Sequence, residues 1–300
     1  MANLILIFIA LFIGLGLQRV KMMPKETHVS INVIILHVCL PALTLLSIPA
    51  LSWEASLMSL CFVAWIIFGA AFVFFSWLGK RMLWSQSVIG CLILTAGLGN
   101  TAFVGFPIIE AAFGKESIKY AVLLDQPGTF LICSSLGIWV ANIFSQGRIP
   151  KRELLKRVIV FPPFIGFTVA VILTMAGWRA EGIVQVLLQR FADMLAPLAL
   201  ISVGLQLKVR EIRDDWHLLA WGLGFKLLVS PILIFGIYKL FGVPHEIFRV
   251  AVLEAAMAPM ITSSIVAASY GLHPRLAGLM VGVGVPFSFL TLTIWYQFLS

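Results

Sequence analysis

Ten long apolar stretches, separated by short polar connectors, constrain this chain more than any other feature of its sequence. The hydrocarbon core of a bilayer is about 30 Å thick, and a helix needs roughly 17–25 apolar residues to cross it. Each stretch falls within or above that range, so the sequence predicts an all-α integral membrane protein. The predicted spans are residues 2–18, 29–51, 56–78, 84–113, 117–144, 158–177, 183–207, 216–241, 248–270 and 276–299.

Composition excludes the soluble alternatives. The 300 residues are 61% hydrophobic and 11% charged, whereas a soluble domain is about 45–50% apolar and about 25% charged. The net charge of +8 comes from cations in short connectors between apolar runs, which argues against a nucleic-acid partner. The four cysteines lie in apolar segments without metal-ligand spacing, so we expect no metal site.

The distribution of lysine and arginine predicts the orientation. The odd-numbered connectors carry 14 of the 21 Lys and Arg residues, and the even-numbered ones carry 5. Because cytoplasmic loops are enriched in these residues, we expect the odd connectors, including the basic "SQGRIPKRELLKR", to be cytoplasmic. This topology places both termini on the non-cytoplasmic side of a plasma (inner) membrane.

The two halves of the chain resemble each other at an offset of about 156–159 residues. "LPALTLLS" in the first half matches "APLALISVG" in the second, and "IIEAAFG" matches "IVAASYG". We predict a first repeat at 1–147, a basic linker at 148–157 and a second repeat at 158–300. Five spans are an odd number, so the second repeat would be inverted, as in secondary transporters whose binding site lies near mid-membrane.

The stretch "TAGLGNTAFVGFPIIEAAFG" lies inside the predicted span 84–113. Thirty helical residues would measure about 45 Å at about 1.5 Å per residue, which exceeds the membrane core. Gly97, Gly99 and Asn100 are poor helix formers, and Pro107 is suited to the first turn of a new helix. We therefore predict that the helix stops near Gly97–Asn100 and restarts near Phe106–Pro107.

A second break is predicted at Pro259 in span 248–270, which the repeat offset places at similar depth. Two broken helices crossing there would aim their positive N-terminal ends at one point, where an anion such as a carboxylate would bind. The alternative is that both prolines only kink their helices. The predicted substrate-binding residues are Asn100, Thr101, Gly105, Pro107, Pro259, Thr262 and Ser263.

Four motifs, "LPALTLLSIP", "GLGNTAFVGFPIIEAAFG", "LISVGLQL" and "EAAMAPMITSSIVAASYGL", resemble the auxin efflux carrier family, the prokaryotic relatives of the plant PIN carriers. The resemblance implies two inverted five-helix repeats, a scaffold and a moving transport domain, and organic-anion substrates. The implied fold is sodium/proton-antiporter-like or bile-acid-symporter-like, with broken crossover helices four and nine. Auxin itself is not implied, because the central loop is short. By matching motif, the crossover residues are Asn100, Thr101, Pro107 and Pro259.

Three ionisable residues within the spans are candidates for coupling-ion or charge roles, since intramembrane charges are rare and costly. Asp125 either binds a coupling proton or cation or caps a helix, and Glu254 lies about one turn before Pro259. Lys226 either pairs with Asp125 or Asp193 or attracts a substrate anion. No cofactor is expected beyond a coupling proton or sodium ion.

These observations predict a secondary transporter of small organic anions, such as mono- or dicarboxylates, that works by alternating access. The alternative is a channel-like or sensory membrane protein that binds an anion without coupled transport. An enzyme is disfavoured, because the sequence contains no His-Glu-x-x-His and no Gly-x-Ser-x-Gly motif. The expected partners are the anion and the lipid bilayer; a homodimer, the transport direction and the coupling ion stay open.

Overall fold

The computed structural model describes residues 2–20, 22–24, 26–50, 55–145, 162–206 and 215–299. Within these ranges the chain is helical, and the single β-bridge joins Gly99 to Pro259. The predicted linker 148–157 lies outside the described residues, as do residues 158–161 of the sixth predicted span and the basic residues of connector 207–214.

The first half of the chain forms α-helices, several π-helical segments and one 3₁₀ turn, η3. In order they are α1 (Ala2–Leu17), α2 (Thr27–Ile34), η1 (Ile35–Cys39), α3 (Leu40–Ser47), α4 (Ala55–Arg81), α5 (Gln86–Gly97), η2 (Thr101–Gly105), α6 (Phe106–Phe113), η3 (Lys115–Ser117), α7 (Ile118–Leu124), η4 (Asp125–Phe130), η5 (Cys133–Gly137) and α8 (Ile138–Phe144).

The second half contains one further π-helical segment, η6, among α-helices. In order they are α10 (Pro162–Met175), α11 (Gly182–Asp193), α12 (Leu195–Gln206), α13 (Trp216–Gly224), η6 (Phe225–Val229), α14 (Ser230–Leu240), α15 (His245–Ala255), α16 (Ile261–Ser269) and α17 (Pro274–Leu299).

Three π-helical segments precede a proline at the second residue of the following α-helix, namely Pro41, Pro107 and Pro231. Proline has no N–H and its ring clashes with the carbonyl four residues earlier. A wider π-helical turn separates these groups and keeps the segment helical. The prolines in these spans therefore widen the helix at a defined place and do not end it.

Among the described residues, six helical stretches are long and apolar enough to cross a membrane: Thr27–Ser47, Ser56–Arg81, Lys115–Phe144, Gly182–Gln206, Trp216–Leu240 and Pro274–Leu299. Shorter apolar helices lie at Ile7–Leu17, Gln86–Gly97, Thr101–Phe113 and Ile165–Met175. The all-α membrane fold is confirmed at this level. The ten-span inverted repeat stays a prediction.

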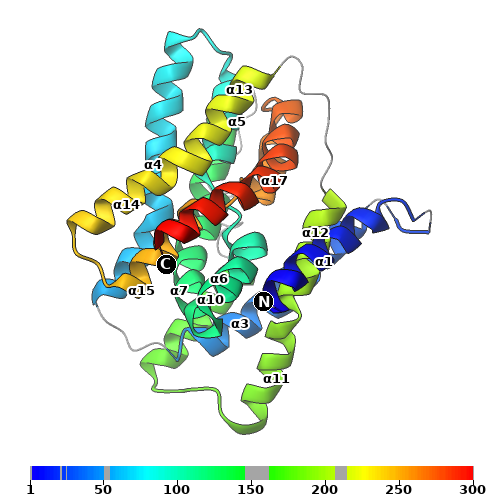
Figure 1. Cartoon of the computed structure of the whole chain (residues 1–300), viewed down its shortest axis with the longest axis vertical. Helices are drawn as coiled ribbons and strands as arrows, with labels where there is room; N and C mark the ends of the chain where they lie inside the picture. Colours follow the sequence, from blue (N-terminus) through cyan, green and yellow to red (C-terminus); the bar gives the residue numbers. More distant parts are fainter. Residues whose placement is uncertain are drawn as a thin grey trace.

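The helices pack in two groups (Figure 1). In the first, α1 packs against α12, and α3 packs against α10 and α11. In the second, α4 contacts α5, α7 and α15, while α17 contacts α13 and α16. Helix α6 contacts α1, and η2 contacts α12, so the interrupted first-half helix lies between the groups. Each group contains helices from both halves of the chain.

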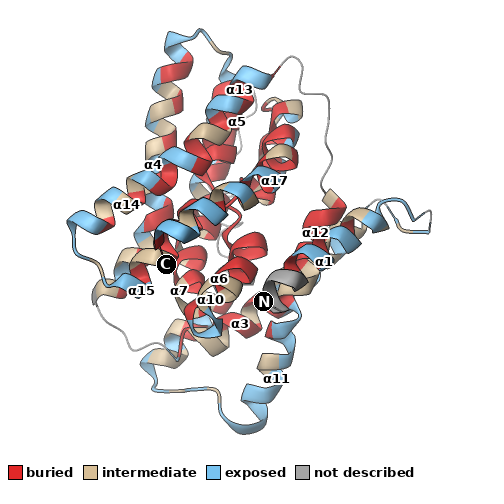
Figure 2. Ribbon diagram, in the orientation of Figure 1, coloured by how far each residue is buried: buried red, intermediate tan, exposed pale blue. Residues whose placement is uncertain are grey.

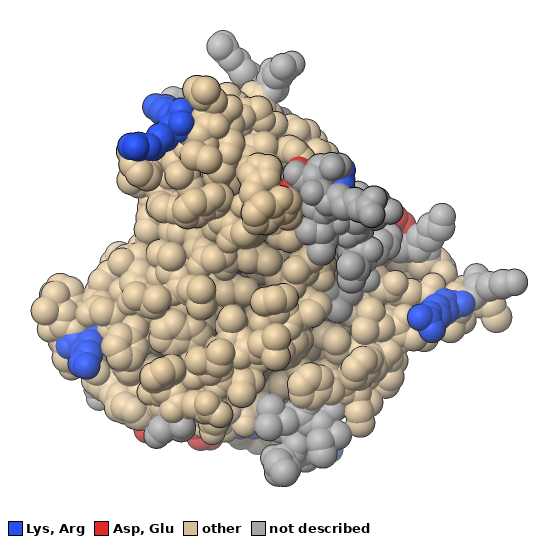
Figure 3. Space-filling view, turned by 45° about the horizontal axis from the view of Figure 1, so that its top comes forward, with Lys and Arg blue, Asp and Glu red and all other residues tan. Residues whose placement is uncertain are grey.

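Exposed residues lie on the outer faces of the helices, and buried residues lie on the faces toward the interior (Figure 2). Phe12, Val73 and Leu290 are each more than 60% exposed. Figure 3 shows lysine and arginine at the margins of one face, with a broad uncharged area between them. An apolar belt with charges at its edges is the surface expected of a protein surrounded by lipid.

Two glycines let α1 and α12 approach closely. A Cβ atom added at Gly14 would lie 2.3 Å from the carbonyl oxygen of Ile201, and one added at Gly204 would lie 2.3 Å from that of Leu11. In lipid, helices associate mainly through such close packing of small residues. This contact joins the first helix of the chain to a helix of the second half.

We expect Gly204→Ala to push α1 away from α12 and to destabilise the protein by about 1–3 kcal/mol, the usual effect of overpacking. The measurement is the midpoint of thermal unfolding in detergent micelles. Gly16→Ala is the matched control, because a Cβ atom there has no neighbour within 4 Å. Equal midpoints for the two variants would contradict this role of Gly204.

Candidate functional site: the helix crossing

The predicted break in span 84–113 is present. Helix α5 ends at Gly97, and Leu98 is extended, with φ −119° and ψ 128°. The predicted restart near Phe106–Pro107 is wrong, since helix η2 already begins at Thr101. The Asn100 carbonyl accepts hydrogen bonds from the N–H of Val104 at 3.3 Å and of Gly105 at 3.0 Å, which closes a wide turn directly after the break. Pro107 then follows inside a continuous helix.

The second interruption separates α15, which ends at Ala255, from α16, which begins at Ile261. Met260 is extended, with φ −69° and ψ 129°. The break therefore surrounds Pro259, as the sequence predicted.

The two interruptions cross and complete each other's hydrogen bonding. The Asn100 N–H donates to the Ala258 carbonyl at 2.7 Å, and the Met260 N–H donates to the Leu98 carbonyl at 3.0 Å. Gly99 lies opposite Pro259 in this antiparallel bridge. An unsatisfied backbone group within a membrane costs several kcal/mol, so unwound backbone is tolerated there only when it finds partners of this kind.

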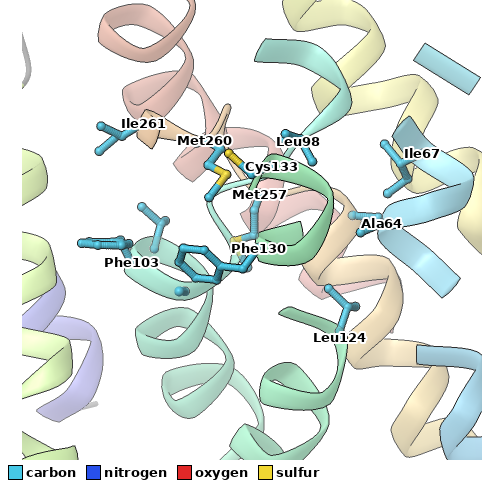
Figure 4. Packing of buried hydrophobic residues seen from close by; sticks show 14 of the residues in the cluster. Ala64, Ile67, Leu98, Phe103, Leu124, Phe130, Cys133, Met257, Met260 and Ile261 are labelled. Atoms are coloured by element: carbon cyan, nitrogen blue, oxygen red, sulfur yellow. The ribbon is translucent and has the colours of Figure 1, made fainter. Parts of the chain in front are cut away.

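Apolar side chains enclose the crossing (Figure 4). Met257, Met260, Cys133 and Phe130 gather around it, and each is at most 4% exposed. On another side, α17 packs closely, because a Cβ atom at Gly284 would lie 2.7 Å from Pro259 Cδ. The polar groups at the crossing therefore lie in a medium with little water.

Asp125, the first residue of η4, connects the crossing to the neighbouring span. Its side chain is fully buried, and it accepts hydrogen bonds from the Thr101 hydroxyl and, at 3.0 Å, from Gln126 Nε2. Thr101 is itself the first residue of η2. Asp125 and Thr101 thus both lie in π-helical segments, which often occur at functional sites.

Lys226, in η6, is 1% exposed, and its ammonium donates to the Ala255 carbonyl at 2.9 Å. A Cβ atom at Gly99 would lie 3.0 Å from Lys226 Nζ, so the ammonium lies against the crossing. The ammonium occupies the C-terminal end of α15, where a helix favours positive charge.

Neither of the ion pairs considered for Lys226 is present among the described residues. The ammonium bonds to the Ala255 carbonyl and forms no salt bridge with Asp125 or Asp193. Asp193 pairs instead with Lys115, at 3.0 Å, and both side chains are about half exposed.

Among these candidate residues, Glu254 is the one whose buried carboxyl group lacks hydrogen-bond partners within the described residues. It is 1% exposed, and within the described residues neither of its carboxyl oxygens has a hydrogen-bond partner. A Cβ atom at Gly105 would lie 2.5 Å and 2.7 Å from these oxygens. The glycine therefore makes room for the carboxyl group. Buried polar groups are almost always paired, so this one indicates a ligand or a proton.

The structure thus brings together six of the sequence-predicted residues: Asn100, Thr101, Gly105, Asp125, Lys226 and Glu254. Pro259 is part of the crossing itself. Of two other candidates, Ser263 is buried and its hydroxyl donates to the Met260 carbonyl at 2.9 Å, whereas Thr262 is only partly buried. Within the part of the chain that the structure describes, the amide oxygen of Gln126 is buried without a partner; its position beside Asp125 is the sequence signal for it.

Two cavities lie along α12. One of about 230 Å³ is lined by Pro107, Glu110 and the first half of α12. The other, of about 200 Å³, is lined by Gln206 at the end of α12 and by Ile261 and Ser264 of α16. Pro107 belongs to α6, and Ile261 and Ser264 belong to α16, so each cavity adjoins one of the half-helices that follow an interruption. No group of three potential metal ligands occurs among the described residues.

Apolar helices with exposed apolar faces, and two interrupted helices that meet inside the core, define a membrane-embedded helical protein. The sequence matches the profile of the family described as "Membrane transport protein" over residues 1–296. The chain belongs to this family, the auxin efflux carrier family that its motifs resemble. It is a family of transporters and not of enzymes.

Two archaeal relatives cover nearly the whole chain. An uncharacterised transporter of Methanothermobacter thermautotrophicus is 26% identical over 294 residues, which are 96% of this chain and 95% of the relative. An uncharacterised transporter of Methanocaldococcus jannaschii is 26% identical over 282 residues, 90% of each chain.

The contact between Thr101 and Asp125 can be tested through stability. We expect Thr101→Val, which keeps the shape but removes the hydroxyl, to destabilise the protein by about 1–3 kcal/mol, because it removes one partner of a buried carboxyl group. Thermal unfolding in detergent measures the effect. In the control Thr95→Val, the buried hydroxyl donates to the Cys91 carbonyl of its own helix, at 2.7 Å. We expect a smaller change there, and an equal or larger one would contradict the assignment.

Proposed function

We propose that the chain is a secondary transporter of small organic anions, such as mono- or dicarboxylates, and that the substrate binds at the helix crossing. The proposal rests on one observation: two interrupted helices cross inside an apolar core, and each supplies the hydrogen-bond partners that the unwound backbone of the other needs. In secondary transporters, discontinuous helices form the binding site near mid-membrane.

The helix termini that meet at the crossing favour the binding of an anion on one side of it. The segment η2–α6 begins at Thr101 and α16 begins at Ile261, so both have their positive N-terminal ends at the crossing. The Asn100 side-chain nitrogen is buried and has no hydrogen-bond partner among the described residues, so it can donate to a carboxylate. The opposite, negative helix end at Ala255 is already occupied by Lys226.

The two cavities support alternating access. One is lined by Pro107 and the first half of α12, and the other by Ser264 and the end of α12. In this proposal the halves 1–147 and 158–300 are inverted repeats. The helix group containing α1, α3 and α12 serves as a scaffold, and the group containing the crossing moves against it, so that each cavity in turn opens to the substrate.

Uptake by proteoliposomes tests the proposal. We expect purified protein to take up labelled dicarboxylate or monocarboxylate, with saturation and with counterflow after preloading. Asn100→Ala and Pro259→Ala should each lower uptake by about tenfold or more, because one removes an anion donor and the other disturbs the crossing. The remaining signal is compared with that of protein-free liposomes.

The control is Pro286→Ala, because Pro286 lies within α17 and is exposed. It should retain uptake, and all variants must elute as folded protein in size-exclusion chromatography. Equal uptake by wild type and by the Asn100→Ala/Pro259→Ala double variant would argue against a site at the crossing. Flux without saturation or counterflow would indicate a channel.

A further inference from the structure

The crossing contains an uneven number of opposite charges. Asp125, Lys226 and Glu254 are each at most 1% exposed. Lys226 binds the carbonyl of Ala255, the residue after Glu254, and Asp125 binds Thr101, four residues before the glycine that makes room for the Glu254 carboxyl group. Two carboxylates and one ammonium would leave one net negative charge in an apolar core. Such a charge is unstable without a counter-charge, because burial removes its hydration.

The hydrogen bonds distinguish the three groups. The Lys226 ammonium is fixed by the Ala255 carbonyl, and the Asp125 carboxylate has two donors, Thr101 and Gln126. The Glu254 oxygens have no partner within the described chain. Glu254 is therefore the group whose negative charge is least supported.

We propose that Asp125, Glu254 and Lys226 form a proton-binding site that holds one proton on its two carboxyl groups, and that this proton is the coupling ion of the transporter. Binding converts one carboxylate and a proton into a carboxylic acid, while Lys226 keeps its positive charge. The cluster is then neutral. The coupling step rests on the proposed transport function, whereas the proton site itself does not.

The geometry favours a proton over a sodium ion. A metal cation at this place would need several oxygen ligands. The Asp125 oxygens already accept hydrogen bonds, and the carbonyl of Ala255 is occupied by Lys226. The Lys226 ammonium thus already occupies the position where a bound metal cation would lie. A proton needs only one carboxyl oxygen, which Glu254 offers.

The helices that pack against α15 carry further ionisable side chains. Glu110 lies five residues beyond Gly105 on α6, more than one helical turn away. The Tyr120 hydroxyl of α7 donates to Glu246 at 3.2 Å, and Arg275 of α17 pairs with Asp215 at 3.4 Å. The others are Cys61, Lys80 and Arg81 of α4, Lys119 of α7, Tyr238 and Lys239 of α14, and Tyr296 of α17.

Infrared spectroscopy of the purified protein tests the site without any transport assay. A buried carboxylic acid gives a carbonyl stretching band that an ionised carboxylate lacks, and this band shifts in heavy water. We expect one carboxylic acid per chain in the wild type near neutral pH. Glu254→Gln should remove the band, because the remaining carboxylate and ammonium neutralise each other. Asp125→Asn should also remove it, and it serves if Glu254→Gln does not fold.

Lys226→Gln gives the opposite expectation. Without the ammonium, both carboxyl groups must be protonated for neutrality, so the band should double. Glu246→Gln is the matched control, since it makes the same change at the exposed start of the same helix, and it should leave the band unchanged. The absence of the band in the wild type, or its persistence in both Glu254→Gln and Asp125→Asn, would overturn the proton site.

Two further experiments complete the test: infrared spectra recorded with and without sodium, and transport measured with and without a pH gradient. Replacing choline with sodium at constant ionic strength should not change the band; a sodium-dependent loss of it would overturn the choice of ion. In proteoliposomes, anion uptake should increase several-fold with a pH gradient in the wild type but not in Glu254→Gln. Anion uptake that does not change with the pH gradient would overturn the coupling step. The absence of any anion uptake would count against the proposed function, and the proton site would then be judged from the infrared spectra alone.

Discussion

The structure depends on how unwound backbone obtains hydrogen bonds where water is scarce. Neither interruption would be stable alone, because each leaves a polar N–H and a carbonyl group within an apolar core. Together, the bonds from Asn100 to Ala258 and from Met260 to Leu98 satisfy these groups. The two halves of the chain are therefore interdependent at this point. Any movement of the crossing must either carry both segments together or break two buried hydrogen bonds.

Glycine has a second role in this protein that is not apparent from helix propensity. The sequence identifies Gly97 and Gly99 as places where a helix ends, and the structure agrees. Gly105, however, lies within η2 and leaves room for the Glu254 carboxyl group, as Gly99 does for the Lys226 ammonium. In lipid, where close packing replaces the hydrophobic effect between helices, the absence of a side chain determines which charges can approach the backbone.

The sequence predicts the class of fold and both breaks, because span length, glycine and proline act locally. It predicts the residue types of the site but not their pairing. Glu254 is far in sequence from Gly105, and Lys226 is far from Gly99, so no local pattern connects them. Helical periodicity, which reveals the buried face in soluble proteins, gives little help, because a lipid-facing side and a core-facing side are both apolar. The sequence places the restart at Pro107 because proline commonly begins a helix, whereas in the structure a π-helical turn accommodates Pro107 inside a helix that begins at Thr101.

In the proposed mechanism, the charges at the crossing link anion binding to protonation. With both carboxylates ionised, the cluster carries a net negative charge and repels an anion that approaches Asn100. With one proton bound, the cluster is neutral, and the helix N-termini at Thr101 and Ile261 then dominate the local field. Linkage is reciprocal, so an anion that binds better to the protonated site must also strengthen proton binding by the same factor. In a medium of low dielectric constant this mutual effect is large, and it provides coupling without any direct contact between the proton and the substrate.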